Sequence, residues 1–408
     1  MTRSSRFVSI LGSALIVAAM AGYACAAGYM QTNLVTNGGD PAVKATFTDP
    51  NLVNPWGISF LPAIPGVFAG TPFWISDNNA GVTTLYDGAG DIVPLVVEIL
   101  SPGDNPNVEP NMNSGSPTGQ VANLTLFTAT PVFDIDSFGA ADFIFATEDG
   151  QIEAWNTALT DTDGDPTVLA GVGVVSDDAV VVVNNSAGTA GGGAAGAVYK
   201  GLALANRTVG GKATPFLYAT NFRTGNIDVF DGTFGMAAVP GTFKDPNVQH
   251  GYAPFGIQTI NNQLWVTWAQ QDAAKHDPVN KPAHGYVSVF DTDGNLLSHF
   301  AQRGHLDSPW GVGLAPSDFG EFANDILIGN FGDGKINAFN PANGHFLGTL
   351  SDAKGKPIIN PGLWSVTFSG PKGETAVNAE PDTLYITAGL VGPTHEKAGL
   401  FAKISPNP

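Results

Sequence analysis

The sequence predicts an all-β chain folded as a six-bladed β-propeller. A segment made of a turn, a bulky residue, a small residue and an apolar strand recurs six times along the chain. Each copy is followed by a second apolar run that ends in polar residues, and amphipathic helical periodicity is nearly absent. The 51 glycines and 29 prolines fit many short strands joined by tight turns. Sheets repeated in this way form a propeller around a central channel.

The first strand of each repeat carries the small residue. The six copies are residues 54–58, 117–121, 199–203, 253–257, 309–313 and 363–367. The first strand of a propeller blade lines the central channel. Because the inner strands crowd the axis there, a small residue at this position predicts close approach between neighbouring blades.

Composition marks the second and third strands of the repeats. Second strands, rich in aromatic and β-branched residues, are expected at residues 73–78, 143–148, 216–221, 264–267, 326–330 and 383–387. Alternating third strands are expected at residues 151–155, 226–230, 286–290 and 335–339. Turn dipeptides such as Asp231-Gly232 and Asp293-Gly294 end two of them.

The two ends of the chain are predicted to meet in the sixth blade. This blade is one strand short, because the sequence ends soon after the apolar run at residues 399–404. Residues 29–35 have the pattern of a strand but belong to no blade of their own. We therefore expect this N-terminal strand to join blade six and close the ring, which would leave no open sheet edge there.

The first 27 residues have the pattern of a secretory signal peptide. Two arginines precede an apolar run at residues 7–19, and small residues offer a cleavage site after Ala26 or Ala27. We therefore expect residues 1–27 to be removed and residues 28–408 to form a single propeller domain. The mature protein is expected in the periplasm or outside the cell.

Charge and cysteine content exclude several classes of function. Without the leader the chain has 15 basic and 36 acidic residues, a net charge of −21. Such a surface repels phosphate backbones, so nucleic acid is not an expected partner. No run beyond the leader approaches the ~18 apolar residues of a membrane span. Cys25, the one cysteine, lies in the leader, so the mature protein is expected to have no disulfide or thiolate metal site.

Four segments of the chain carry a resemblance to a known family: residues 51–57, 145–150, 218–222 and 329–339. They resemble segments of an uncharacterised family of exported bacterial β-propeller proteins. The chain is also distantly similar to NHL-repeat propellers and to the six-bladed gluconolactonase group. Active members of that group hold one divalent cation at the channel mouth, partly through a Glu at the start of a first-blade inner strand. This chain has Asn54 or Pro55 at the corresponding place.

Polar and aromatic residues are predicted to surround one mouth of the channel, where the loops after the second strands meet the starts of the inner strands. The candidate metal ligands are Asp77, Glu148, Asn221, Asp272 and Asn330. The candidate ligand-binding residues are Trp56, Phe255, Trp310, Trp364 and Asn78. An oxygen-rich ring suits Ca²⁺ or another hard divalent cation, and aromatic walls suit a sugar or another flat ligand. The alternative is that the polar residues cap turns and that the tryptophans pack between blades.

A long insert in the fourth repeat places histidine near acidic residues. Asp272 and His276 are four residues apart, so one helical turn would aim both side chains at one metal ion. The insert also contains Asp277 and His284. The alternative is a solvated lid that holds no metal.

The sequence leaves two functions open. The first is an exported binding scaffold that recognises a protein, a glycan or a small ligand at the channel mouth. The second is a divalent-metal-dependent hydrolase or lactonase, in which a cation on the acidic rim would polarise a carbonyl and activate water. The sequence contains no Gly-x-Ser-x-Gly elbow and no phosphate-binding Gly-Lys-Ser loop. A catalytic triad would have to be assembled from different blades.

Overall fold

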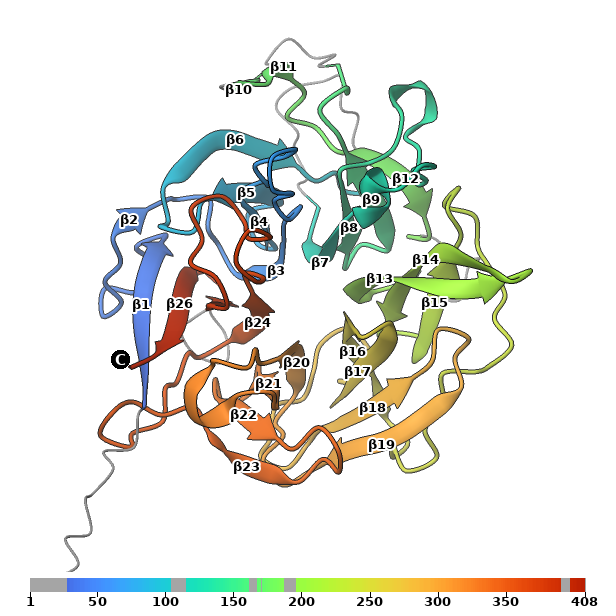
Figure 1. The fold of residues 1–408 in the computed structure, drawn as a ribbon. Coiled ribbons are helices and arrows are strands. Elements are labelled where there is room, and N and C mark those ends of the chain that lie inside the picture. Colours follow the sequence, from blue (N-terminus) through green and yellow to red (C-terminus); the bar gives the residue numbers. More distant parts are fainter. Residues whose placement is uncertain are drawn as a thin grey trace, which may run out of the picture.

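The computed structural model describes residues 28–103, 115–160, 167–169, 171–186, 196–389 and 397–407. Six of its sheets are arranged like the blades of a propeller around a central axis (Figure 1). Helix in this part of the chain is limited to short 3-10 segments such as Leu124–Phe127 and Gly320–Phe322. None of the described helices has the length and hydropathy of a membrane span. The predicted six-bladed fold is therefore confirmed. The predicted leader at residues 1–27 lies outside the described residues.

The first three blades each begin with their innermost strand and add strands outward. Blade 1 contains β3 (Pro55–Ser59), β4 (Phe73–Asp77), β5 (Val82–Tyr86) and β6 (Ile92–Glu98). Blade 2 contains β7 (Pro117–Ala122), β8 (Phe143–Thr147), β9 (Gln151–Trp155) and β12 (Val180–Asn184). Blade 3 contains β13 (Tyr199–Val209), β14 (Lys212–Asn221) and β15 (Asn226–Phe230). The strands β10 (Thr167–Leu169) and β11 (Gly173–Val175) pair with each other in a separate small sheet.

The remaining blades follow the same order. Blade 4 contains β16 (Tyr252–Ile260), β17 (Gln263–Gln270), β18 (Tyr286–Phe290) and β19 (Leu296–Gln302). Blade 5 contains β20 (Pro309–Leu314), β21 (Ile326–Asn330), β22 (Ile336–Phe339) and β23 (Phe346–Thr349). Blade 6 combines β24 (Leu363–Phe368), β25 (Leu384–Ala388) and β26 (Leu400–Pro406) with β1 (Tyr29–Thr36) and β2 (Phe47–Thr48).

The N-terminal strand closes the ring, as the sequence predicts. Strand β1 pairs antiparallel with β26, from Tyr29 opposite Pro406 to Thr36 opposite Leu400, so the first and last strands of the described chain share one sheet (Figure 1). The Tyr29 hydroxyl donates to the carbonyl of Phe319 at 3.0 Å and accepts from the Phe322 amide at 3.0 Å. Burial raises the pKa of Tyr29 to about 12. Strand β1 is thus held by its backbone pairing with β26 and by the buried Tyr29 side chain, which reaches blade 5.

The small residues of the inner strands lie where neighbouring blades approach. A Cβ atom on Gly57 would lie 2.7 Å from the carbonyl oxygen of Thr118, and one on Gly311 would lie 2.5 Å from that of Trp364. A β-bulge interrupts the pairing of each inner strand next to this position. A bulge turns the residue before the glycine out of the regular alternation. As a result, one side chain per blade is free to point toward the axis, and it is bulky in every blade except blade 2, which has Thr118.

Candidate functional site

Four aromatic side chains from different blades meet at the end of the channel where the inner strands begin. Trp56 of blade 1 stacks on Trp364 of blade 6 with ring centroids 3.4 Å apart, and Trp310 of blade 5 packs edge-on against both. Phe255 of blade 4 lies 6.4 Å from Trp56. Since blades 1 and 4 are not neighbours, these rings can meet only across the axis. The cluster therefore fills the channel at this end.

The aromatic residues predicted to bind a ligand are thus brought together, but their rings pack against one another. Trp56, Phe255 and Trp364 are buried and Trp310 is half-buried. Trp364 Nε1 donates to Asn54 Oδ1 at 2.9 Å, and Trp310 Nε1 donates to the carbonyl of Lys200 at 2.9 Å. These contacts favour the alternative in which the tryptophans pack between blades.

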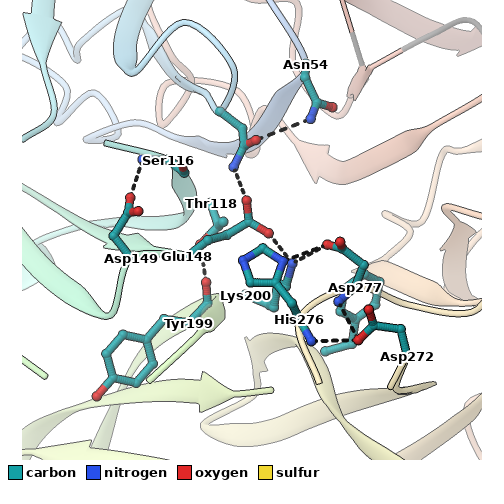
Figure 2. Close-up of polar contacts among 12 residues, drawn as sticks. Asn54, Ser116, Thr118, Glu148, Asp149, Tyr199, Lys200, Asp272, His276 and Asp277 are labelled. Carbon is teal, nitrogen blue, oxygen red and sulfur yellow. Dashed lines mark hydrogen bonds and ion pairs between the residues drawn. The ribbon is translucent and has the colours of Figure 1, made fainter. Parts of the chain in front are cut away.

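Lys200 is the residue of this cluster that sequence reasoning missed. It stands on β13 at the repeat position that Trp56 and Trp310 occupy in their own blades, and its side chain is fully buried. Its ammonium bonds to Glu148 and lies 3.4 Å from Asp277, between the two carboxylates (Figure 2). It also lies 5.2 Å from the centroid of the Trp56 ring. The signal in the sequence was a charged residue at a position that other repeats fill with an aromatic ring.

Glu148 connects the buried lysine to blade 1. Its Oε2 accepts a hydrogen bond from Asn78 Nδ2 at 2.9 Å, and Asn78 Oδ1 accepts from Asn54 at 3.4 Å. Asn78 and Glu148 are equivalent, since each directly follows the second strand of its blade. Of the predicted rim residues, these two are joined by a direct hydrogen bond. The charge of the buried Lys200 ammonium is therefore compensated by two nearby carboxylates.

The insert of blade four covers this end through His276 and Asp277. His276 Nδ1 lies 3.0 Å from Asp277 Oδ1, and this hydrogen bond raises the pKa of His276. The same bond, aided by the Lys200 ammonium, lowers the pKa of Asp277 to about 2. The Asp272 carboxylate accepts the backbone N–H of His276 at 2.8 Å and that of Asp277 at 3.3 Å (Figure 2). Asp272 therefore shapes the turn that presents the other two side chains.

Three predicted metal ligands lie inside their own blades. Asp77 is buried and accepts from Thr84 at 2.7 Å, and burial holds its pKa well above the ordinary range. Asn221 donates to Asp228 at 3.0 Å, and Asn330 donates to the carbonyl of His305 at 2.8 Å. Each stands at the last position of a second strand. Because successive strand residues point to opposite faces, the following residue faces the channel instead. In blades 1, 3 and 5 the predicted metal ligand therefore stands one residue before the position that Glu148 occupies in blade 2.

The residues at this end do not fit a calcium ion as they are arranged. Glu148, His276 and Asp277 each offer one ligand atom, and these atoms lie within 4.8 Å of one another. Calcium requires about six to eight oxygen ligands, whereas this group supplies two carboxylates and an imidazole. The Lys200 ammonium already bonds to both carboxylates. A divalent cation would have to displace a buried positive charge.

The opposite end of the channel is a bowl open to solvent. It has a volume of about 410 Å³ and is lined by residues that follow the small residue of each inner strand, including Phe60, Val121, Leu204, Gln258, Leu314 and Phe368. Leu124 and Leu314 at its rim are 48% and 37% exposed. Toward the axis the space narrows to about 20 Å³ between Gly57, Gly119 and Gly311, room for about one water molecule. The bowl is therefore a pocket with a closed floor.

Comparison with known proteins gives relatives without an assigned activity. No protein-family profile matches this sequence. Two proteins of Acanthamoeba polyphaga mimivirus, "Uncharacterized protein L690" and "Uncharacterized protein R648", are each 29% identical to it. The first match covers 79% of this chain and 74% of the relative, and the second covers 78% and 69%. The predicted bacterial origin finds no support in these viral relatives.

The solved structures that resemble this chain are much more distant in sequence. A streptogramin B lyase is 12% identical, with a TM-score of 0.42 over 93% of this chain and 97% of the lyase. The soluble aldose sugar dehydrogenase of Escherichia coli is 13% identical, with a TM-score of 0.46 over 93% and 99%. At this level of likeness neither activity transfers to this protein.

Proposed function

We propose that this protein is a binding scaffold that takes a small ligand into the bowl at the carboxyl ends of its inner strands. The observation that carries the proposal is the contrast between the two channel ends. One end is filled by Trp56, Trp364 and the buried Lys200–Glu148 pair, whereas the other is a cavity of about 410 Å³. Pockets for small ligands have volumes of about 300 to 1,000 Å³ and mostly apolar walls.

The shape of the bowl favours a small molecule over the other ligands that the sequence allowed. Its walls converge on a narrow floor between Gly57 and Gly311, so a ligand is surrounded on several sides. Its apolar lining suits the hydrophobic effect as the source of affinity. Because the insert carrying Asp277 covers the opposite end, we propose that the ligand enters only from the bowl side.

The metal-dependent hydrolase is the weaker reading of this geometry. Hydrolysis through a cation would require Glu148 and Asp277 to exchange the Lys200 ammonium for the metal. Among the residues described by the structure, those that line the bowl include no carboxylate, histidine or lysine that could hold a metal or transfer a proton there. We also propose that binding takes place outside the cytoplasm, a location that rests on the predicted leader at residues 1–27.

A neutral fluorescent probe tests this proposal. N-phenyl-1-naphthylamine is uncharged and its fluorescence rises in apolar surroundings, so titration into the protein should give a saturable increase. Thr367→Trp places a large ring on the half-buried wall of the bowl and should abolish the increase. Leu347→Trp, on the exposed outer strand β23, is the matched control and should leave it unchanged. Equal binding by wild type and Thr367→Trp, or no saturable binding by wild type, would contradict the proposal.

A further inference from the structure

The bowl is lined by uncharged residues. Its described walls consist of aliphatic and aromatic side chains, glycine, and the neutral polar residues serine, threonine and glutamine. A charged ligand group placed there would lose its hydration without gaining a counter-ion. The net charge of −21 after removal of the leader adds general repulsion for anions. The lining therefore selects against ionised ligands.

Two of the polar side chains in this wall, Gln120 and Thr259, donate hydrogen bonds within the fold. Gln120 Nε2 donates to the carbonyls of Gly57 at 2.7 Å and Trp74 at 2.6 Å. Thr259 Oγ1 donates to the carbonyl of Leu204 at 2.9 Å. These bonds hold neighbouring blades together, so a ligand cannot recruit these donors without cost to the fold.

Gln258 differs from these residues. It lies on β16 and lines both the bowl and the narrow space beneath it, and it is exposed. Its side chain makes no hydrogen bond to any other residue that the structure describes. A glutamine amide offers two donors and an acceptor, so it can pair with a hydroxyl, an amide or a carbonyl group. Gln258 thus places an exposed neutral amide at the floor of an apolar cavity, in the same lining as Ser59 Oγ and Gln120 Oε1, which are buried and unpaired among the described residues.

We infer that the ligand is an uncharged amphiphile, with an apolar chain or ring in the bowl and a neutral hydroxyl or amide group bonded to Gln258. This inference rests on the proposed function, since it names the ligand class of the same cavity. It assigns the two parts of the ligand to different walls. The apolar part lies against Val121, Leu204 and Phe368, and the polar part points toward the narrow floor.

Three probes with the same eight-carbon chain separate the ligand classes. 1-Octanol, octanoate and octylammonium are each titrated calorimetrically into the wild-type protein at about pH 7 and moderate salt. We expect octanol to bind at least about tenfold more tightly than either ion, because each ion loses hydration without a partner. If octanoate or octylammonium binds within about twofold of octanol, the uncharged ligand class is wrong while the proposed function stands. If none of the three binds and the neutral fluorescent probe also fails to bind, both the ligand class and the proposed function are wrong.

A substitution then tests the role of Gln258. Gln258→Leu removes the amide but keeps an apolar side chain of similar size, and should weaken octanol binding by about five- to tenfold. Octane lacks a polar group, so its binding should not weaken. Gln302→Leu, at an exposed glutamine on the outer strand of the same blade, is the matched control and should bind octanol like wild type. An unchanged octanol affinity in Gln258→Leu would overturn the assignment of the polar group to this residue.

Discussion

The carboxylate of Glu148, which follows the second strand of blade 2, bonds to the ammonium of Lys200 on the inner strand of blade 3. The lysine side chain is fully buried and the glutamate side chain is 12% exposed. The pair lies beside Trp56 and Phe222, inside the end of the channel that aromatic rings fill. One ion pair therefore joins two blades at the sealed end.

Removing the lysine should destabilise the protein strongly. Lys200→Met leaves the largely buried Glu148 carboxylate without its main partner, which costs about 3–5 kcal/mol in comparable buried pairs. Adding Glu148→Gln to this variant should recover much of the loss, because no charge is then left unpaired. Urea unfolding gives the free energy of unfolding of the wild type, the single variant and the double variant. Lys403→Met, which breaks an ion pair to the exposed Glu380, is the control and should cost less than about 1 kcal/mol. Equal losses in the two lysine variants would show that the buried pair has no special role.

Removing the closing strand should open the ring. Deletion of residues 29–35 removes the ladder on β26 and leaves that strand as an exposed edge, so the melting temperature should fall sharply. Tyr29→Ala alone should cost about 3–5 kcal/mol, because a buried ring and its hydroxyl contacts are lost. Met30→Ala, at a half-exposed position of the same strand, is the control. A truncated protein that melts within about two degrees of the intact one would contradict closure by β1.

The contact between His276 and Asp277 should depend on pH. A carboxyl whose pKa is lowered on folding stabilises the protein above its unfolded value of about 3.9, and this contribution disappears as the pH falls toward 2. A histidine whose pKa is raised contributes below about 6.5, and its contribution disappears as the pH rises through the folded pKa. The contact is therefore strongest between about pH 4 and 6.5.

This window can be measured with one variant. The difference in unfolding free energy between wild type and Asp277→Asn should be largest near pH 5 and smaller near pH 3 and pH 8. Part of the difference should persist at pH 8, because Lys200 still faces Asp277 at 3.4 Å. A difference that does not change between about pH 3 and 8 would mean that the two side chains do not form this pair.

Calcium should not stabilise the protein through the sealed end. The Lys200 ammonium already bonds to both Glu148 and Asp277, so Ca²⁺ would have to displace it and would still find fewer oxygens than it needs. We expect the same melting temperature with calcium and after treatment with EDTA. A rise with calcium that EDTA reverses and that Glu148→Ala abolishes would restore the metal site that the sequence predicted.

The fold could be predicted because it repeats. Six copies of one strand pattern with a small residue near the axis determine the number of blades, and the spare strand at residues 29–35 has one blade left to complete. The crowding at Gly57 and Gly311 is the physical reason for the repeated small residue. These features are local in sequence and do not depend on which side chains pack together.

The site was harder to predict because it depends on register and on contacts across the ring. Asp77 and Asn78 are adjacent in sequence, yet one lies inside blade 1 and the other reaches Glu148 of blade 2. A shift of one residue along a strand reverses which side chain faces the channel. Lys200 pairs with residues 52 and 77 positions away, a relationship that no local pattern reveals. The bowl could not be predicted because residues such as Leu204 and Phe368 have the same apolar side chains as the residues of the core.

A crystal structure of the protein soaked with 1-octanol shows most directly which end of the channel takes the ligand. We expect one octanol in the bowl, with its hydroxyl bonded to Gln258, its chain against Leu204 and Phe368, and the Trp56–Trp364 stack unchanged. Octanol bound instead between the tryptophans, with Lys200 displaced from Glu148, would contradict the central claim that the ligand enters the open end of the channel.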